Sequence, residues 1–229
     1  MYKLLVNVVL VFIFLPGINA CSSLKDKIVT ADYFPIKEGR ILQYSVVKTK
    51  HRFEYVKVRF EYSIKTLSSR ELNGRKVTPF QYNNGNLIFI SEDKNGVYYI
   101  AEQLSGDDGP SLAPVPKLIY SYPLRLGAVF RETWQSSLTE NQYDVDIVYK
   151  VMDDYEDVEV PAGKFKKCIH IKGIGTSALP DGNIFSLELH DWLCPDVGNV
   201  KEILEESCTV KIDGYPDGGR QLTTLKLIH

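Results

Sequence analysis

Two histidines and one glutamate have the residue types and spacing that come nearest to a chemical site. His170 falls in an apolar run from Phe165 to Gly173, and His190 falls in a second run from Ile184 to Leu193. If these runs pair as a hairpin, the imidazoles become neighbours, with Glu188 on the same strand face as His190. Imidazole and carboxylate groups transfer protons and bind metals, but a metal site needs three or four converging ligands. We therefore expect surface histidines beside a carboxylate, and no metal site.

The densest acidic segment, Asp153 to Glu159, offers the oxygen ligands that calcium prefers. It lacks the regular alternation and the glycine of a calcium-binding loop, so a solvated strand end is the better interpretation. Serine-nucleophile motifs, phosphate-binding loops and dinucleotide-binding glycines are absent from the sequence. We therefore expect no catalytic residue, no cofactor and no enzymatic activity.

Four cysteines divide into Cys21, near the amino terminus, and Cys168, Cys194 and Cys208 in the body of the chain. An oxidising compartment permits a disulfide, but an odd number leaves at least one of the last three thiols unpaired within a monomer. Small buried side chains in strands are an equally good interpretation, so the pairing stays open. No two cysteines have the Cys-x-x-Cys spacing of a zinc site.

Residues 1–20 have the pattern of a bacterial export signal. Lys3 supplies a positive charge, residues 4–15 are mostly apolar, and Pro16-Gly17 and the small Ala20 follow. A membrane-spanning helix needs about 20 apolar residues, and this segment is shorter. We expect a signal peptide that is cleaved.

The four residues Ile18 to Cys21 resemble the lipobox of bacterial lipoproteins, in which an aliphatic residue and a small residue precede the cysteine. The resemblance implies lipidation of Cys21, and several acyl chains anchor a protein stably because each buried CH₂ contributes about 0.8 kcal/mol. Ser22 in place of Asp implies the outer membrane if the cell is Gram-negative. Residues 21–31 form a short linker, so we expect the domain to lie close to the membrane. An ordinary secretory signal is the alternative.

Residues 32–229 have the pattern of a single antiparallel β domain. From Phe53 to Lys65, and again from Tyr143 to Val151, apolar and polar side chains alternate with the strand period of two. Such strands bury one face and expose the other. No window of a dozen residues has sustained helical spacing, so we predict a mainly β fold with little helix. The series expected to be buried in the first segment is Val56, Val58, Phe60, Tyr62 and Ile64.

Shorter apolar runs, separated by Asn, Asp and Gly, complete the predicted sheet. Asn83 to Gly85, Asp93 to Gly96 and Asp181 to Asn183 have the composition of hairpin turns. The shorter runs are 76–82, 86–91, 97–103, 165–173, 184–193, 200–204, 208–212 and 221–228.

A weak internal repeat has an offset of 88 residues. Phe34 to Leu42 and Tyr122 to Phe130 share an aromatic residue, a proline, an aliphatic residue and, after two positions, a glycine. Chance similarity between strands is the alternative. If the repeat is real, halves at 32–118 and 119–229 are connected through Ser105 to Pro116. We expect them to share one continuous curved sheet, because each half alone supplies little core.

Short motifs follow one another in a fixed order along the mature chain. They are Tyr33-Phe34-Pro35-Ile36 with Gly39 and Tyr44, Tyr122-Pro123-Leu124 with Gly127, Val160 to Phe165, and Trp192 with Pro195, Val197-Gly198 and Val200-Lys201. In this order they resemble uncharacterised bacterial lipoproteins of the DUF3108 and TapB-like kind. The chain departs from that pattern at Leu42 and Phe130, where tryptophan is common. The resemblance implies a LolA/LolB-like half-barrel, an antiparallel sheet around an apolar concavity that accepts acyl chains.

The balance of basic and acidic residues argues against a nucleic-acid partner. The full chain has 27 basic and 29 acidic residues, and loss of Lys3 with the signal leaves 26 basic residues, which is not a nucleic-acid-binding composition. Fourteen tyrosines and ten phenylalanines are compatible with a ligand groove. We expect a non-enzymatic, membrane-anchored envelope lipoprotein whose curved sheet binds a lipid or other apolar ligand, or an envelope protein partner. The alternatives are an envelope enzyme that acts on cell-wall polymer or nutrient, and a structural subunit of a surface complex.

Overall fold

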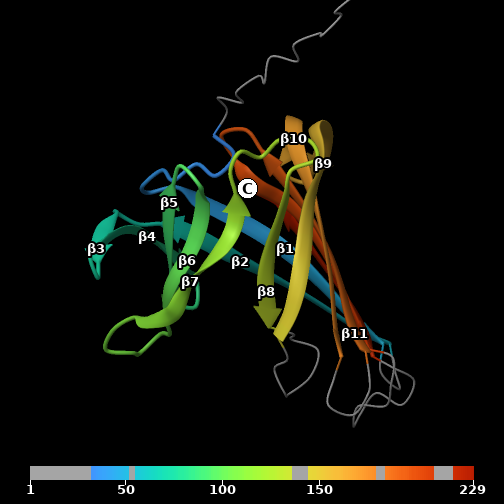
Figure 1. Ribbon diagram of the computed structural model, residues 1–229, viewed down its shortest axis with the longest axis horizontal. Coiled ribbons are helices and arrows are strands. Elements are labelled where there is room, and N and C mark those ends of the chain that lie inside the picture. Colours follow the sequence, from blue (N-terminus) through green and yellow to red (C-terminus); the bar gives the residue numbers. More distant parts are fainter. Residues whose placement is uncertain (1–31, 52–54, 136–143, 179–183, 209–218) are drawn as a thin grey trace, which may run out of the picture.

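The computed structural model describes residues 32–51, 55–135, 144–178, 184–208 and 219–229 (Figure 1). These residues form thirteen strands, all paired antiparallel, and no helix. The predicted all-β class is therefore confirmed. The described part of the chain has no helix long and apolar enough to cross a membrane. The predicted signal peptide, Cys21, the linker and the turn at Asp181 to Asn183 lie outside the described residues.

The strands follow the alternating runs closely, although β1, β3, β7 and β8 have no counterpart among the predicted runs. The runs at 200–204 and 208–212 belong to one strand as far as Cys208, where the described segment ends. In chain order the strands are β1 (Ile41–His51), β2 (Tyr55–Thr66), β3 (Arg70–Leu72), β4 (Arg75–Tyr82), β5 (Leu87–Asp93), β6 (Gly96–Gln103), β7 (Ser111–Ser121), β8 (Val129–Gln135), β9 (Asp144–Val160), β10 (Gly163–Ala178), β11 (Ile184–Cys194), β12 (Gly198–Cys208) and β13 (Arg220–Leu227).

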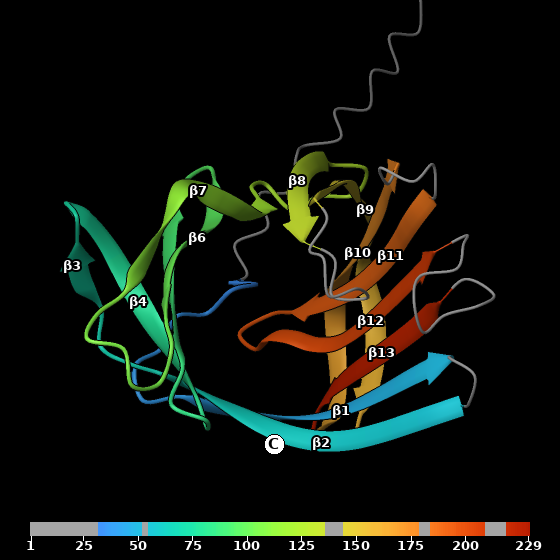
Figure 2. The ribbon, with the colours of Figure 1, turned by 90° about the horizontal axis from the view of Figure 1, so that it is seen from below.

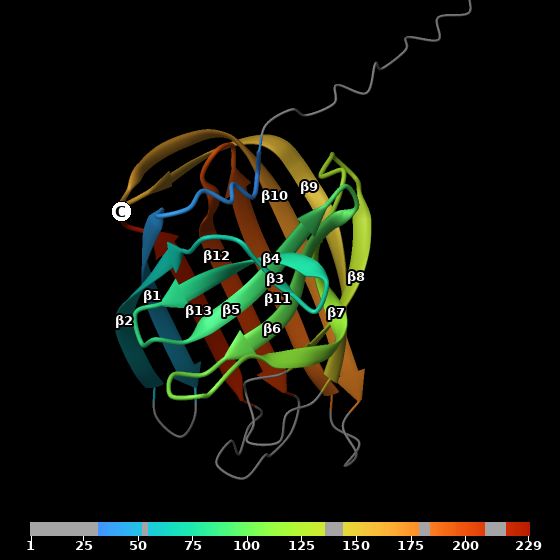
Figure 3. The same ribbon diagram turned by 90° about the vertical axis from the view of Figure 1, so that its left-hand side faces the viewer.

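One sheet contains all the strands, in the order β7-β6-β5-β4-β2-β1-β13-β12-β11-β10-β9-β8, with β3 paired to β4. The first strand, β1, pairs with the last, β13, from Tyr44 opposite Leu227 to His51 opposite Arg220. The sheet curls until β7 comes back beside β8, although no ladder joins the described residues of these two strands (Figures 2 and 3). The result is a nearly closed barrel, which is curled further than the predicted half-barrel.

The two copies of the predicted repeat make the same turn at the start of a strand. Gly39 N donates to Thr66 O at 2.8 Å, and Gly127 N donates to Val151 O at 2.9 Å. Both glycines have a left-handed backbone, with φ of 78° and 79°, which glycine adopts at little steric cost. In the sheet order, β1 of the first half lies beside β13 of the second, and β7 and β8, at the two ends of this order, come into contact where the sheet curls round. This arrangement supports the interpretation of the motif as a repeat.

The predicted connection between halves, Ser105 to Pro116, is not a linker. Its second part belongs to β7, which begins at Ser111 and pairs with β6. The turn between the two strand series lies instead at residues 122–128, between β7 and β8.

The main core lies on the concave face of the sheet. Two glycines on β10 allow β9 to pack closely there, because a Cβ added at Gly173 would lie 2.7 Å from a ring carbon of Tyr149. A Cβ at Gly175 would lie 2.8 Å from Val145 Cγ1. The fully buried side chains of this core include Ile147, Ile169, Ile171, Phe185 and Leu193.

One prediction of burial is wrong. Val56, Val58 and Phe60 share a strand face as predicted, but they are 43%, 48% and 47% exposed. The reason is that β2 pairs with β4 only from Ile64 to Thr66, so the rest of β2 extends past the strands that would cover it.

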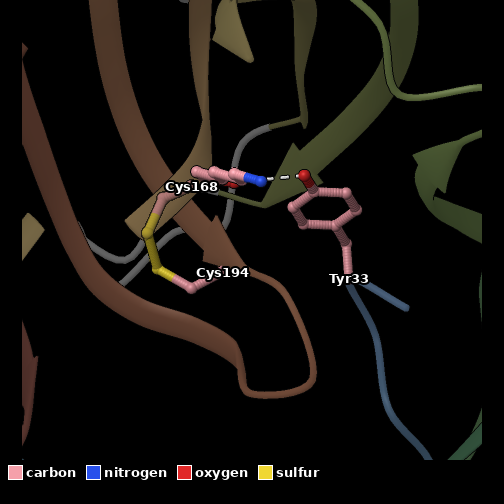
Figure 4. Close-up of a disulfide and its surroundings, with 4 residues drawn as sticks. Tyr33, Cys168 and Cys194 are labelled. Atoms are coloured by element: carbon pink, nitrogen blue, oxygen red, sulfur yellow. Dashed lines mark hydrogen bonds between the residues drawn. A yellow bond between two sulfur atoms is a disulfide. The ribbon is translucent and has the colours of Figure 1, made fainter. Parts of the chain in front are cut away.

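A disulfide joins Cys168 to Cys194, and Cys208 is a free, buried thiol. The disulfide links β10 to the end of β11, and Tyr33 lies beside it (Figure 4). Tyr33 OH donates to Lys167 O at 3.1 Å, which ties the segment before β1 to the start of β10. The pairing that the sequence left open is therefore one bridge and one unpaired cysteine.

Candidate functional site

The predicted histidine neighbours meet on the outer face of the barrel. β10 and β11 pair as the predicted hairpin, and His170 Nε2 lies 2.8 Å from His190 Nδ1. His190 Nε2 lies 2.8 Å from Glu188 Oε1. Glu188, His190 and His170 therefore form a continuous series of hydrogen bonds. They lie on the face opposite the core, since Leu189, between Glu188 and His190, points inward.

Charged side chains lie at both ends of this hydrogen-bonded series. Glu156 Oε2 lies 3.5 Å from His170 Nδ1, and Lys172 Nζ lies 2.7 Å from Glu188 Oε1. Hydrogen bonds from Lys172 and His190 lower the pKa of Glu188, while burial of its ring lowers the pKa of His170. This arrangement can move a proton along the sheet surface.

The same cluster has an aromatic wall. The Trp192 ring stacks on His170 with centroids 4.6 Å apart, and Lys201 Nζ lies 3.9 Å above the Trp192 ring. Ile203 and Glu205 complete the shallow depression around the histidines. Within the part of the chain that the structure describes, no group of three His, Cys, Asp or Glu residues is arranged to hold a metal.

The acidic run from Asp153 to Glu159 lies within β9. Because successive side chains of a strand point to opposite faces, its carboxylates do not converge as they would in a calcium loop. Of these residues, Glu156 reaches His170, and Glu159 forms an exposed ion pair with Lys164 at 3.3 Å.

A second candidate site is a cavity of about 210 Å³ inside the barrel. It is larger than a cavity of about 150 Å³ that accepts benzene, although smaller than the roughly 300–1,000 Å³ of drug-sized ligand sites. Most of its lining is aliphatic or aromatic. The residues around it include Phe34, Leu42, Tyr44, Tyr62, Ile64, Phe80, Ile88, Ile90, Ile119, Tyr120 and Leu225, with Arg40, Asn199 and Glu202 as the charged or amide groups.

Two acidic residues lie directly opposite each other in the sheet, Asp191 on β11 and Glu202 on β12, and Glu202 lines this cavity. Asp191 is only 4% exposed, and it accepts hydrogen bonds from Tyr120 OH at 3.3 Å and from Asn199 Nδ2 at 3.1 Å. Burial raises the pKa of Asp191 to about 7, against the effect of these hydrogen bonds. Burial and then the Asp191 charge raise the pKa of Glu202 to about 8. The pair therefore retains a proton near neutral pH.

Other polar groups extend this interior network. Tyr44 OH donates to Asn199 O at 2.9 Å, while Asn199 Oδ1 is buried without a hydrogen-bond partner. Burial raises the pKa of Glu132, on β8, to about 7, and Lys117 partly opposes this effect. The lumen thus combines an apolar wall with an excess of acceptor groups.

The acid pair was not among the residues singled out from the sequence, although a signal for it exists. Asp191 lies on the same strand face as the apolar Leu187 and Leu189, and Glu202 lies on the same face as Val200 and Leu204. A carboxylate on the apolar face of a half-buried strand indicates a buried acid.

No protein-family model and no curated protein matches the sequence. Two solved structures match. One is a predicted exported protein with a YmcC-like fold from Bacteroides fragilis, at 14% identity and a TM-score of 0.43, with 87% of this chain and 98% of that chain covered. The other is a predicted lipoprotein from Parabacteroides distasonis, at 14% identity and a TM-score of 0.38, with 86% and 98% covered. This similarity assigns no function, and the DUF3108 and TapB-like resemblance stays a prediction.

Proposed function

We propose that this protein is an envelope lipoprotein whose barrel binds a small apolar ligand in its lumen. The observation that carries the proposal is the cavity of about 210 Å³ between β1, β2, β4, β5, β7, β12 and β13. Its lining is mostly aliphatic and aromatic, and each CH₂ that leaves water there contributes about 0.8 kcal/mol. A ring or a short alkyl segment fits this volume, whereas a complete diacyl lipid does not.

The proposed location at the cell envelope rests on the lipobox-like residues Ile18 to Cys21. A lipidated Cys21 would hold the barrel within a few residues of a bilayer, where apolar ligands are concentrated. Replacing Cys21 with Ser should release the protein from the membrane fraction and abolish incorporation of labelled palmitate. Retention of the label in Cys21→Ser would exclude lipidation at this residue.

Native mass spectrometry tests the ligand. The mature chain, without its signal peptide and with Cys21→Ser, is purified in the absence of detergent, and mass is compared before and after organic extraction. Ile119→Trp places a larger side chain at the cavity, and Val115→Trp, on the same strand but 70% exposed, is the matched control. We expect the adduct to be lost in the first variant and kept in the second. An equal adduct in both variants, or none in the parent protein, would contradict binding in the lumen.

A second candidate function, hydrolysis of cell-wall polymer or a nutrient, is favoured by the chain of Glu188, His190 and His170. A hydrogen-bonded carboxylate that orients an imidazole is a general-base arrangement. The test is turnover of peptidoglycan fragments and chromogenic esters by the parent protein and by His190→Gln and Glu202→Gln. Loss of turnover in the histidine variant alone would support the enzyme, and no turnover by the parent protein on any substrate would remove it.

An envelope protein partner is the remaining alternative, and it includes a structural role in a surface complex. The exposed apolar residues Val56, Val58 and Phe60 favour such a contact. Cross-linking in intact cells, followed by mass spectrometry, tests this alternative, because a stable partner would be recovered at this strand of the native protein and lost in Val58→Asp.

A further inference from the structure

We propose that the ligand in the lumen has a cationic end, such as a primary ammonium group, that binds at Glu202 and Asn199. This inference rests on the proposed function and names the chemical class of its ligand. It depends on which hydrogen-bonding groups the barrel has already paired and which it leaves open toward the cavity.

Three donors at this end of the cavity are already used within the protein. Tyr44 OH donates to Asn199 O at 2.9 Å, and Tyr120 OH donates to Asp191 Oδ2 at 3.3 Å. Asn199 Nδ2 donates to Asp191 Oδ1 at 3.1 Å. A ligand that approaches here therefore meets these three donors as groups that are already paired.

Two of the groups left open are acceptors. Asn199 Oδ1 is buried and has no hydrogen-bond partner among the residues that the structure describes, which costs free energy until a donor reaches it. The carboxyl group of Glu202 lines the same cavity. An ammonium group has three N–H donors and no acceptor, so it matches these oxygens. It would also take the place of the proton that Asp191 and Glu202 hold between them.

An anionic head group is disfavoured at this position. It would add a negative charge beside Asp191 and Glu202, and the barrel holds further acidic side chains at Glu132 and Glu206. In a poorly solvated interior, such repulsion is screened much less than at the surface. The same ligand chain with a carboxylate end should therefore bind more weakly than with an ammonium end.

Arg40 is the one cation among the described residues that line the cavity, and it defines the competing model, in which the ligand has a carboxylate end. Burial raises the pKa of the Tyr44 phenol, Arg40 lowers it, and Glu202 raises it further. Arg40 and Glu202 therefore both act near this phenol, and only a comparison of ligands with opposite charges separates the two models.

The test uses three ligands of equal chain length, octylamine, octanol and octanoate, and the mature Cys21→Ser protein. Isothermal titration calorimetry at pH 7.5, in buffers of different ionisation enthalpy, measures affinity and proton release together. We expect octylamine to bind at least tenfold more tightly than octanoate, with release of a proton. Glu202→Gln should reduce this preference to less than threefold. Glu205→Gln, on the same strand but paired with Arg220 on the outer face, should retain it.

The outcomes separate this inference from the proposed function. Tighter binding of octanoate, lost in Arg40→Met, would overturn the cationic ligand and leave a lumenal ligand in place. Equal affinity for all three compounds would overturn the cationic ligand as well. No binding of any compound would count against the proposed function itself. If Glu202→Gln does not fold, as judged by its thermal transition, Asn199→Leu replaces it and should also weaken octylamine selectively.

Discussion

The interior carboxylates predict a barrel that loses stability as the pH rises, and Glu132 allows the effect to be measured at one residue. Glu132 lies opposite Ile147 in the β8–β9 ladder, on the face that carries the core. Burial raises its pKa from 4.5 to about 7, with Lys117 opposing and Asp191 adding to the shift. Because the folded pKa lies above the unfolded one, the stability is fully present below pH 4.5 and is lost as the pH rises through 7.

The expected loss of stability follows from the difference between the unfolded and the folded pKa of Glu132. At about 1.36 kcal/mol per pKa unit, a rise from 4.5 to about 7 corresponds to a loss of about 3 kcal/mol, most of it between pH 5 and 8. Glu132→Gln keeps the size of the side chain and removes the ionisation, so the variant should lose about that much less stability over this range. Asp191 and Glu202 titrate in the same direction and should leave a residual slope in the variant.

Urea denaturation at half-unit steps from pH 5 to pH 8.5, followed by circular dichroism, measures this difference. Glu61→Gln, on the exposed face of β2, is the control and should keep the slope of the parent protein. If parent and Glu132→Gln curves run parallel across the whole range, then Glu132 ionises in the folded barrel without a cost, and the reasoning about its burial is refuted.

Two further predictions concern the fold. Gly175→Ala should destabilise the barrel by about 1–3 kcal/mol through overpacking, because the new Cβ would lie 2.8 Å from Val145 Cγ1. Gly109→Ala is the control, since its new Cβ would have nothing within 4 Å, and it should be nearly neutral. Urea denaturation measures both variants. Reducing the Cys168–Cys194 disulfide, which spans 26 residues, should lower the free energy of unfolding by about 3 kcal/mol. In the Cys168→Ser, Cys194→Ser double variant, the same reductant should not shift the urea unfolding transition. An unchanged transition when the parent protein is reduced would show that the disulfide does not stabilise the barrel.

Local pattern was sufficient for nine of the thirteen strands in the described residues, all but β1, β3, β7 and β8, and for one side-chain cluster. The histidine pair could be predicted because His170 and His190 belong to strands joined by a short connection, so that hairpin pairing alone brings them together. The acid pair has the same local origin, since Asp191 and Glu202 lie on consecutive paired strands. Its signal in the sequence is that Asp191 and Glu202 each stand at a position where the neighbouring inward-facing residues of the strand are apolar.

The burial of Val56, Val58 and Phe60 could not be predicted in the same way. The period of two assigns these side chains to one face, and the structure keeps that assignment. Whether the face is covered depends on where β4 leaves β2, after the Ile64 to Thr66 ladder, and no pattern within β2 contains that information.

The all-β class, most of the strands, the repeated motif around Gly39 and Gly127, and the neighbouring histidines could all be predicted from the sequence. Each of these follows from the order of residues close in the chain or from the period of a strand. The curling of the sheet into a nearly closed barrel, with β1 paired to β13, and the cavity inside it depend on contacts between residues far apart in the chain. That cavity is lined by residues far apart in the chain, such as Leu42, Ile90 and Leu225, and the volume left between them depends on packing in three dimensions.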